Sequence, residues 1–212
     1  MATFSELQTK VSRRLLDANN TAVSSEDVAD AINDSVRYWK YRRFWFNQGS
    51  MSETVTAQSA IIPLPSDFLV PVIQDAGFYI EYSELRYVLR KLDIEPYTEA
   101  WQGNGFGIPR SYVRIDNRYE MYPIPDRDYT IKGQYLKEYP PLVNDTDTND
   151  FTDNADRLLV LWTCANLSGE LRQDEKMEAY FRAAADDYFR QLQIMTDKSN
   201  AAGSLVVSST IL

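Results

Sequence analysis

Apolar side chains recur at helical spacing near the start of the 212-residue chain. The first stripe, at steps of three and four residues, consists of Phe4, Leu7, Val11 and Leu15. It predicts an amphipathic helix of about four turns. A second stripe follows the break NNTAVSSED, with Ser25 as the expected N-cap, and consists of Val28, Ala31, Ile32, Val36 and Trp39. We expect the two helices to form a hairpin over residues 1–48.

Helical spacing returns near the end of the chain. One stripe runs up to Gly169 and consists of Leu158, Leu161, Trp162 and Ala165; the next consists of Met177, Tyr180, Phe181, Ala184, Tyr188, Leu192 and Met195. The segment RQDEK provides a bend between them. An acidic run, residues 144–156, precedes both stripes and is interpreted as a solvated linker, with Asp153 or Asn154 capping the next helix.

Between the helical ends the pattern changes to short β-prone runs that are broken by proline and glycine. The runs RYEMY and YTIKGQY alternate apolar and polar residues on either side of PIPDRD, which predicts an antiparallel hairpin with one buried face. Residues 94–109 contain too much glycine and proline for a long element.

These patterns predict an α+β fold that is mainly helical, a four-helix bundle built from both chain ends with an inserted antiparallel β-region. The expected parts are a helical hairpin (1–48), a β-rich insertion (49–142), an acidic linker with a helix pair (143–199) and an extended tail (200–212).

Composition restricts the chemistry. Histidine is absent and Cys164 is the single cysteine, so we expect no metal centre, no cofactor and no disulfide. Neither a secretory signal nor a membrane-spanning run is recognisable, which predicts a soluble protein made in the cytoplasm. The net charge is −9, with +1 in residues 1–48 and −10 in the rest, and an acidic protein of this kind is a poor tight binder of nucleic acid.

Basic and aromatic residues alternate in RYWKYRRFWFNQ, residues 37–48. One interpretation is a surface that binds nucleic acid or phosphate, since arginine and aromatic faces stack on bases. The other is an aromatic face packed on a sheet, with Lys40, Arg42 and Arg43 directed to solvent or to acidic neighbours. We favour the second, because no second basic cluster joins this segment.

Two segments partly match the sequence patterns of a phosphate-binding loop and a calcium-binding loop. GNGFG lacks the strand and helix that a phosphate loop requires, since Pro109 follows at once, and is interpreted as a mobile loop. The acidic run places Asp145, Asp147, Asn149, Asp153 and Asp156 at calcium-loop positions 1, 3, 5, 9 and 12. However, Asp150 occupies the position that calls for glycine, and no helix enters the loop, so we do not expect calcium to bind.

The chain ends in AAGSLVVSSTIL, which is uncharged and β-prone. Such a segment suits either a frayed terminus or a strand that adds to a partner's sheet or groove.

The helical hairpin, the tyrosine-rich strands with a YPIPD turn, the acidic linker before LLVLWTCANLSGELRQDEKMEAYF and the apolar tail together resemble the head-to-tail adaptor (connector) proteins of tailed bacteriophages. The resemblance implies a structural protein without enzymatic activity, located in the virion neck after assembly in the host cytoplasm. It implies a ring, typically of twelve copies, that lies beneath the portal protein and passes double-stranded DNA through its channel without binding it tightly.

The resemblance also implies two docking sites. The tail would bind the portal through Leu205, Val206, Val207, Ile211 and Leu212. A hairpin loop containing Pro123, Pro125, Asp126 and Arg127 would face a tail or nozzle protein. Two alternatives stay open: another virion part, such as a tail-completion or nozzle protein, and a carbohydrate-binding or glycoside-cleaving protein, for which the 14 tyrosines, four tryptophans and many carboxylates argue.

Overall fold

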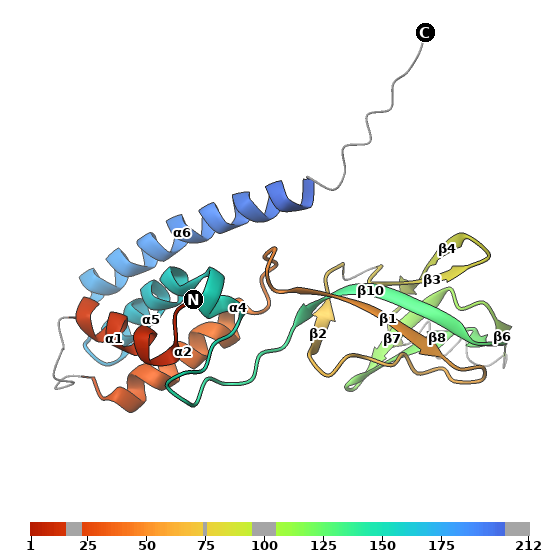
Figure 1. The fold of residues 1–212 in the computed structure, drawn as a ribbon, viewed down its shortest axis with the longest axis horizontal. Helices are drawn as coiled ribbons and strands as arrows, with labels where there is room; N and C mark the ends of the chain where they lie inside the picture. Colours follow the sequence, from red (N-terminus) through yellow and green to blue (C-terminus); the bar gives the residue numbers. More distant parts are fainter. Residues whose placement is uncertain (16–22, 74–75, 95–104, 202–212) are drawn as a thin grey trace, which may run out of the picture. The chain divides into compact units, whose positions relative to one another are not determined.

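The computed structural model describes residues 1–15, 23–73, 76–94 and 105–201 (Figure 1). The chain divides into two compact units. The helical unit comprises residues 1–47 and 139–212, and the β unit comprises residues 48–138.

Five helices are described in the helical unit: α1 (Phe4–Arg14), α2 (Ser25–Trp39), α4 (Asp150–Asn154), α5 (Asp156–Glu170) and α6 (Glu175–Ala201). A capping box begins α1, in which the Thr3 side chain and Glu6 satisfy each other's backbone N–H groups. Ser24 and Asp27 form the same arrangement at α2. The predicted cap, Ser25, is therefore wrong by one position, because Asp27 lies at the third helical position only when Ser24 is the cap.

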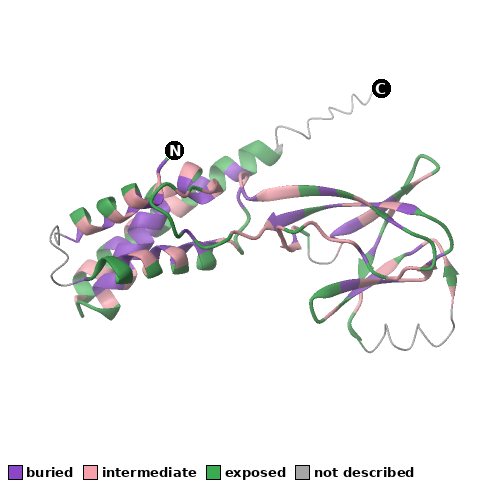
Figure 2. Ribbon diagram, turned by 60° about the horizontal axis from the view of Figure 1, so that its bottom comes forward, coloured by how far each residue is buried: buried purple, intermediate pink, exposed green. Residues whose placement is uncertain are grey.

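Helix α5 is the centre of the helical unit and packs against α1, α2, α4 and α6 (Figure 1). The sequence predicted a single stripe, but residues on every side of α5 are buried, among them Leu159, Val160, Cys164 and Leu167 (Figure 2). A helix that is apolar all round belongs inside a core. The predicted four-helix bundle is not confirmed, since one central helix is surrounded by the others.

The buried face of α6 agrees with the predicted stripe at five of its seven positions, since Phe181 and Leu192 are buried and Met177, Ala184 and Tyr188 pack against the core. Its buried residues include Phe181, Ala185 and Leu192, whereas Tyr180 is 66% exposed and Met195 is 55% exposed. Both residues lie one position away from the side of the helix that contacts α5.

The prediction that Asp153 or Asn154 caps the next helix is also wrong. Asn149 caps α4, and its Oδ1 accepts hydrogen bonds from the backbone N–H groups of Phe151 and Thr152, both at 3.0 Å. Helix α5 then begins after Ala155 without a side-chain cap. Because α4 breaks the acidic run, residues 144–156 do not form a simple linker.

The β unit contains ten described strands: β1 (Gln48–Val55), β2 (Phe68–Pro71), β3 (Phe78–Tyr82), β4 (Leu85–Val88), β5 (Arg90–Lys91), β6 (Phe106–Gly107), β7 (Ser111–Ile115), β8 (Arg118–Tyr122), β9 (Ile124–Pro125) and β10 (Tyr129–Lys137). The largest sheet has the order β1-β10-β3-β4, with β2 also paired to β10; the others are β5-β7-β8 and β6-β9. The fold is α+β, and with five helices and ten strands described it is not mainly helical.

The hairpin predicted across PIPDRD is wrong. Strand β8 pairs with β7, and β10 pairs with β1, β2 and β3. Strand β7 reaches β8 through a two-residue turn, in which Asp116 has a φ of 53°. The PIPDRD segment instead contains β9, which pairs in parallel with β6, and carries the chain from one sheet into another.

Aromatic rings fill the core of the β unit. Phe78 and Tyr112 are fully buried, and their ring centroids lie 4.9 Å apart in an edge-to-face contact. Tyr119 packs against both. The tyrosine-rich strands therefore supply a core rather than an exposed aromatic platform.

Candidate functional site

The loop of residues 123–128 was predicted to face a partner, and its charged side chains are held in place. Tyr129 donates its hydroxyl to Asp126 Oδ1 at 2.6 Å, and Arg127 Nη2 donates to Asp126 Oδ2 at 3.1 Å. Arg127 Nη1 also donates to the Tyr82 hydroxyl at 2.7 Å. The loop therefore presents an ordered pair of opposite charges at the surface.

Backbone contacts fix the same loop from its other side. The N–H of Gln58 donates to the carbonyl of Pro125 at 2.9 Å, and the N–H of Ala57 donates to Asp128 Oδ1 at 2.8 Å. Pro125 is buried and Pro123 is half-buried, whereas Asp126 and Arg127 are exposed. Of the four predicted loop residues, the two charged ones are the most exposed.

The charges of this loop are stable near neutral pH. The hydrogen bond from Tyr129 is the main cause that lowers the pKa of Asp126, and Asp126 in turn raises the pKa of Arg127. Burial raises the pKa of the Tyr129 hydroxyl to about 12. These shifts keep Asp126 and Arg127 charged at pH 7, which suits the two side chains to docking.

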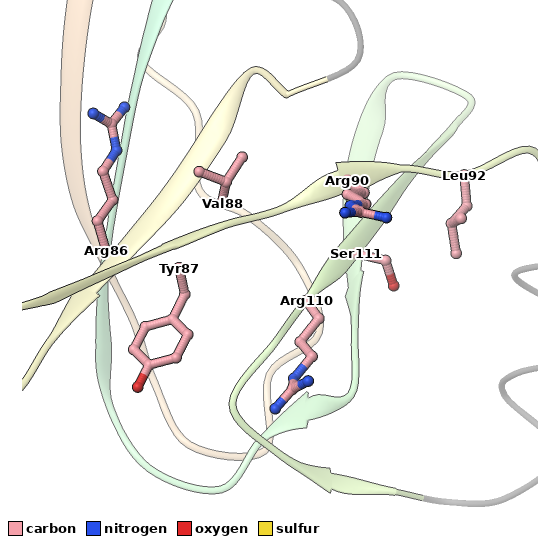
Figure 3. Close-up of a pocket in the computed structure, with 7 residues that line it drawn as sticks. All are labelled: Arg86, Tyr87, Val88, Arg90, Leu92, Arg110 and Ser111. Carbon is pink, nitrogen blue, oxygen red and sulfur yellow. The ribbon is translucent and has the colours of Figure 1, made fainter.

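A second surface lies on the β unit and was not predicted. It is a groove of about 660 Å³, called the arginine groove here, and is lined by Arg86, Tyr87, Val88, Arg90, Leu92, Arg110 and Ser111 (Figure 3). No carboxylate is among these lining residues. The guanidinium of Arg86 lies over the Tyr79 ring, 3.6 Å from its centroid, and points away from Arg110 (Figure 3). The three arginines thus spread along the groove and do not converge on one point.

The sequence did not reveal the arginine groove because its cations come from separate segments. Parallel pairing of β5 with β7 places Arg90 opposite Ser111. A neighbouring hollow on the same unit contains Lys91 and Arg114 among its lining residues. These cations form a second basic surface, which the sequence pattern did not show. The spacing of apolar residues along one sequence does not indicate that Arg90 and Ser111, which are far apart in the chain, pair in parallel.

The aromatic and basic segment 37–48 belongs mostly to the core of the helical unit. Trp39 contacts Trp162 at 5.0 Å and Phe189 at 4.8 Å between ring centroids, and Phe44 contacts Phe151 at 5.8 Å. These aromatic residues pack on helices, so the prediction that they pack on a sheet is wrong. Arg42 and Arg43 are exposed and Lys40 is half-buried.

Several oxygens of the acidic run form hydrogen bonds or ion pairs within the fold. The Asp147 carboxylate accepts from the N–H groups of Val143 and Asn144, each at 2.8 Å, and these bonds lower its pKa. The backbone carbonyls of Asp145 and Asp147 accept from Ser5 and Phe4 at the start of α1. Asp156 pairs with Lys10 at 2.7 Å. Within the described part of the chain, no cluster of acidic residues has the arrangement of a metal site.

The remaining candidate segments are only partly described. Of GNGFG, Phe106 and Gly107 form β6, and the next described element is strand β7 rather than the helix that a phosphate loop requires. The predicted portal-binding residues Leu205, Val206, Val207, Ile211 and Leu212 lie outside the described residues. No helix in the described ranges is long and apolar enough to span a bilayer.

Comparison with known families gives one match over nearly the whole chain. Residues 2–208 match the family described as SU10 adaptor protein, a family of phage head-to-tail adaptors. This family is a structural one and not a class of enzymes. A search of curated proteins finds no match.

Proposed function

Because the chain belongs to the SU10 adaptor protein family, we propose that it joins the capsid of a tailed phage to its tail as a ring beneath the portal protein. The match over residues 2–208 is the observation that carries this proposal, since it includes both the helical and the β unit. In the assembled virion the ring surrounds the exit channel for double-stranded DNA. Twelve copies is the expected number.

The charge of the chain supports a channel that lets DNA pass. A net charge of −9 opposes tight binding to phosphate, since affinity for DNA comes from cations that release counterions. Like charge also keeps free copies apart in solution. The chain is therefore expected to stay a monomer or weak oligomer until the portal brings copies together.

Two contacts complete the proposal. The tail residues Leu205, Val207, Ile211 and Leu212 dock on the portal, where each buried side chain contributes roughly 1.5 to 3 kcal/mol before ordering costs. The loop with Asp126 and Arg127 faces the tail-side protein, and its ordered charges favour a partner with complementary charges.

Negative-stain microscopy of the purified protein, with and without its cognate portal, tests the ring. We expect single particles alone and a ring on the portal. A stable dodecamer of the free protein at micromolar concentration and physiological salt would contradict assembly on the portal. A portal that stays bare, while the protein binds a preformed tail or nozzle, would favour another neck or tail component.

Deletion of residues 204–212 tests the docking segment separately. We expect attachment to portal-bearing heads to fall strongly, with little change in thermal stability. A matched control replaces the same residues by a Gly/Ser segment of equal length, which separates the loss of apolar side chains from the loss of length. Attachment at the wild-type level after deletion would move the anchor elsewhere, first to the helical hairpin of residues 3–46.

A further inference from the structure

The arginine groove lies along a sheet edge that has no strand partner among the described residues. Strand β4 is the last strand of the β1-β10-β3-β4 sheet. It pairs with β3 through a two-residue turn, so that Tyr82 lies opposite Leu85 and Ile80 opposite Tyr87. In an antiparallel pair, alternate residues direct their backbone groups to the partner and away from it. Leu85 and Tyr87 therefore face β3.

Backbone hydrogen bonds beyond β4 confirm this alternation. The Leu89 N–H donates to the Phe78 carbonyl of β3 at 2.9 Å. The N–H groups of Arg90 and Leu92 point to the opposite side, where they donate to the carbonyls of Arg110 and Tyr112 at 2.9 and 2.8 Å. On that side, β7 pairs with Arg90 and Lys91 but not with β4.

Arg86 and Val88 consequently direct their N–H and C=O groups into the arginine groove, next to the start of β7. An added strand there would find a row of backbone donors and acceptors, as in recognition by β-augmentation. The Val88 side chain is 48% exposed and offers apolar contact beside this edge. The edge is short, which limits unselective pairing.

The arginine charges around the groove indicate which kind of segment would bind there. Arg86, Arg90 and Arg110 are exposed, and the described residues include no salt-bridge partner for them. An acidic segment would therefore gain charge pairs along its length without displacing internal ones. Duplex DNA fits less well, because its phosphates can accept from the N–H groups of the edge but have no donor for its C=O groups, and the net charge of the chain repels it.

We propose that the arginine groove binds an extended acidic polypeptide segment of a partner protein, which adds as a strand to the edge of β4 at Arg86 and Val88, where no described strand pairs. This inference rests on the sheet edge and its charges, and it does not require the chain to act as an adaptor. The partner is recognised by alternating acidic and apolar side chains.

A labelled synthetic peptide of about eight residues with alternating glutamate and valine serves as the probe, since it is longer than the four-residue strand β4 beside which it would lie. Binding to the full chain is measured by fluorescence anisotropy, in parallel with a lysine–valine peptide and a labelled DNA duplex. We expect the acidic peptide to bind at least about tenfold more tightly than either control.

Two kinds of variant test the two parts of the proposal. Val88→Pro removes an N–H that makes no bond to β3, so it should weaken the acidic peptide about tenfold with unchanged circular dichroism. Arg110→Glu should weaken it to a similar extent, whereas Arg42→Glu, an exposed position in the helical unit with the same charge change, should have little effect.

The proposal is overturned if the acidic peptide binds no better than the lysine peptide, or if Arg110→Glu and Arg42→Glu weaken it equally. It is also overturned if DNA binds most tightly. A folded Val88→Pro variant with wild-type affinity for the acidic peptide would overturn it as well, since binding would then depend on charge and not on the strand edge. Should Val88→Pro fail to fold, the comparison of Arg110→Glu with Arg42→Glu still decides between groove-specific and unspecific binding. Failure of this test leaves the portal experiment unaffected.

Discussion

Asn47 holds the segment that follows α2, and its replacement should destabilise the helical unit. The side chain is completely buried. Its Oδ1 accepts from the Phe44 N–H at 2.9 Å, and its Nδ2 donates to the carbonyls of Arg42 and Lys40 at 2.8 and 3.3 Å. One amide thus closes the turn that places Phe44 in the core.

The magnitude follows from these three bonds. Each contributes about 0.5–1.5 kcal/mol net, and the buried setting adds a cost when a backbone group loses its partner. We therefore expect Asn47→Ala to lower the free energy of unfolding by about 3 kcal/mol. Asn47→Asp keeps the acceptor but directs an oxygen at two carbonyls, so it should destabilise at least as much.

Urea unfolding followed by tryptophan fluorescence measures the effect, since Trp39, Trp45 and Trp162 all belong to the helical unit. Asn200→Ala, at an exposed position of α6, is the matched control and should stay within about 0.5 kcal/mol of wild type. A loss below about 1 kcal/mol for Asn47→Ala would refute the reasoning, because aromatic packing alone would then hold the segment.

Three further predictions concern other parts of the fold. Gly133→Ala should destabilise the β unit by about 1–3 kcal/mol in thermal or urea unfolding, since the new Cβ would lie 2.5 Å from the Gly77 carbonyl oxygen; an unchanged midpoint would show that β10 can shift. Burial raises the pKa of Cys164 to about 12, so alkylation by iodoacetamide at pH 8 should be slow until urea is added, and fast labelling of the folded chain would contradict its burial. Burial also raises the pKa of Tyr129 to about 12 from an ordinary value of 10.0, so its stabilising contribution is complete below pH 10 and is lost as pH rises toward 12; Tyr129→Phe should flatten this alkaline decline in urea midpoints.

Helices with a single buried face were well predicted from the sequence. The first stripe coincides with α1, and the second with α2, because their spacing of three and four residues is a local property. The cap of α2 was misplaced, although Ser24 and Asp27 have the spacing of a capping box. Helix α5 was harder to predict, since a stripe search finds one face of a helix that is in fact buried on all sides.

The pairing of the strands was the feature that the sequence predicted least well. Alternation shows which residues of β8 and β10 point inward, but it does not show that the two strands belong to different sheets. The arginine groove was missed for the same reason, because it depends on the parallel pairing of Arg90 with Ser111. The residues of the charged loop were identified from the sequence. The hydrogen bonds that hold the loop in place could not be predicted, because their partners, Tyr82 and Ala57, are distant in the sequence.

The described polar groups have different roles in the two units. In the helical unit, the side-chain oxygens of Asp147, Asn149 and Asp156 accept hydrogen bonds at turns and caps or pair with Lys10 of α1. Replacing these residues should therefore lower the stability of the fold. In the β unit, the Arg110 guanidinium and the outward N–H and C=O groups at Val88 have no such internal role among the described residues. Substitutions there should alter recognition while the fold persists. Surface substitutions away from internal contacts change stability little, so the arginine groove is where a substitution tests binding most separately from folding.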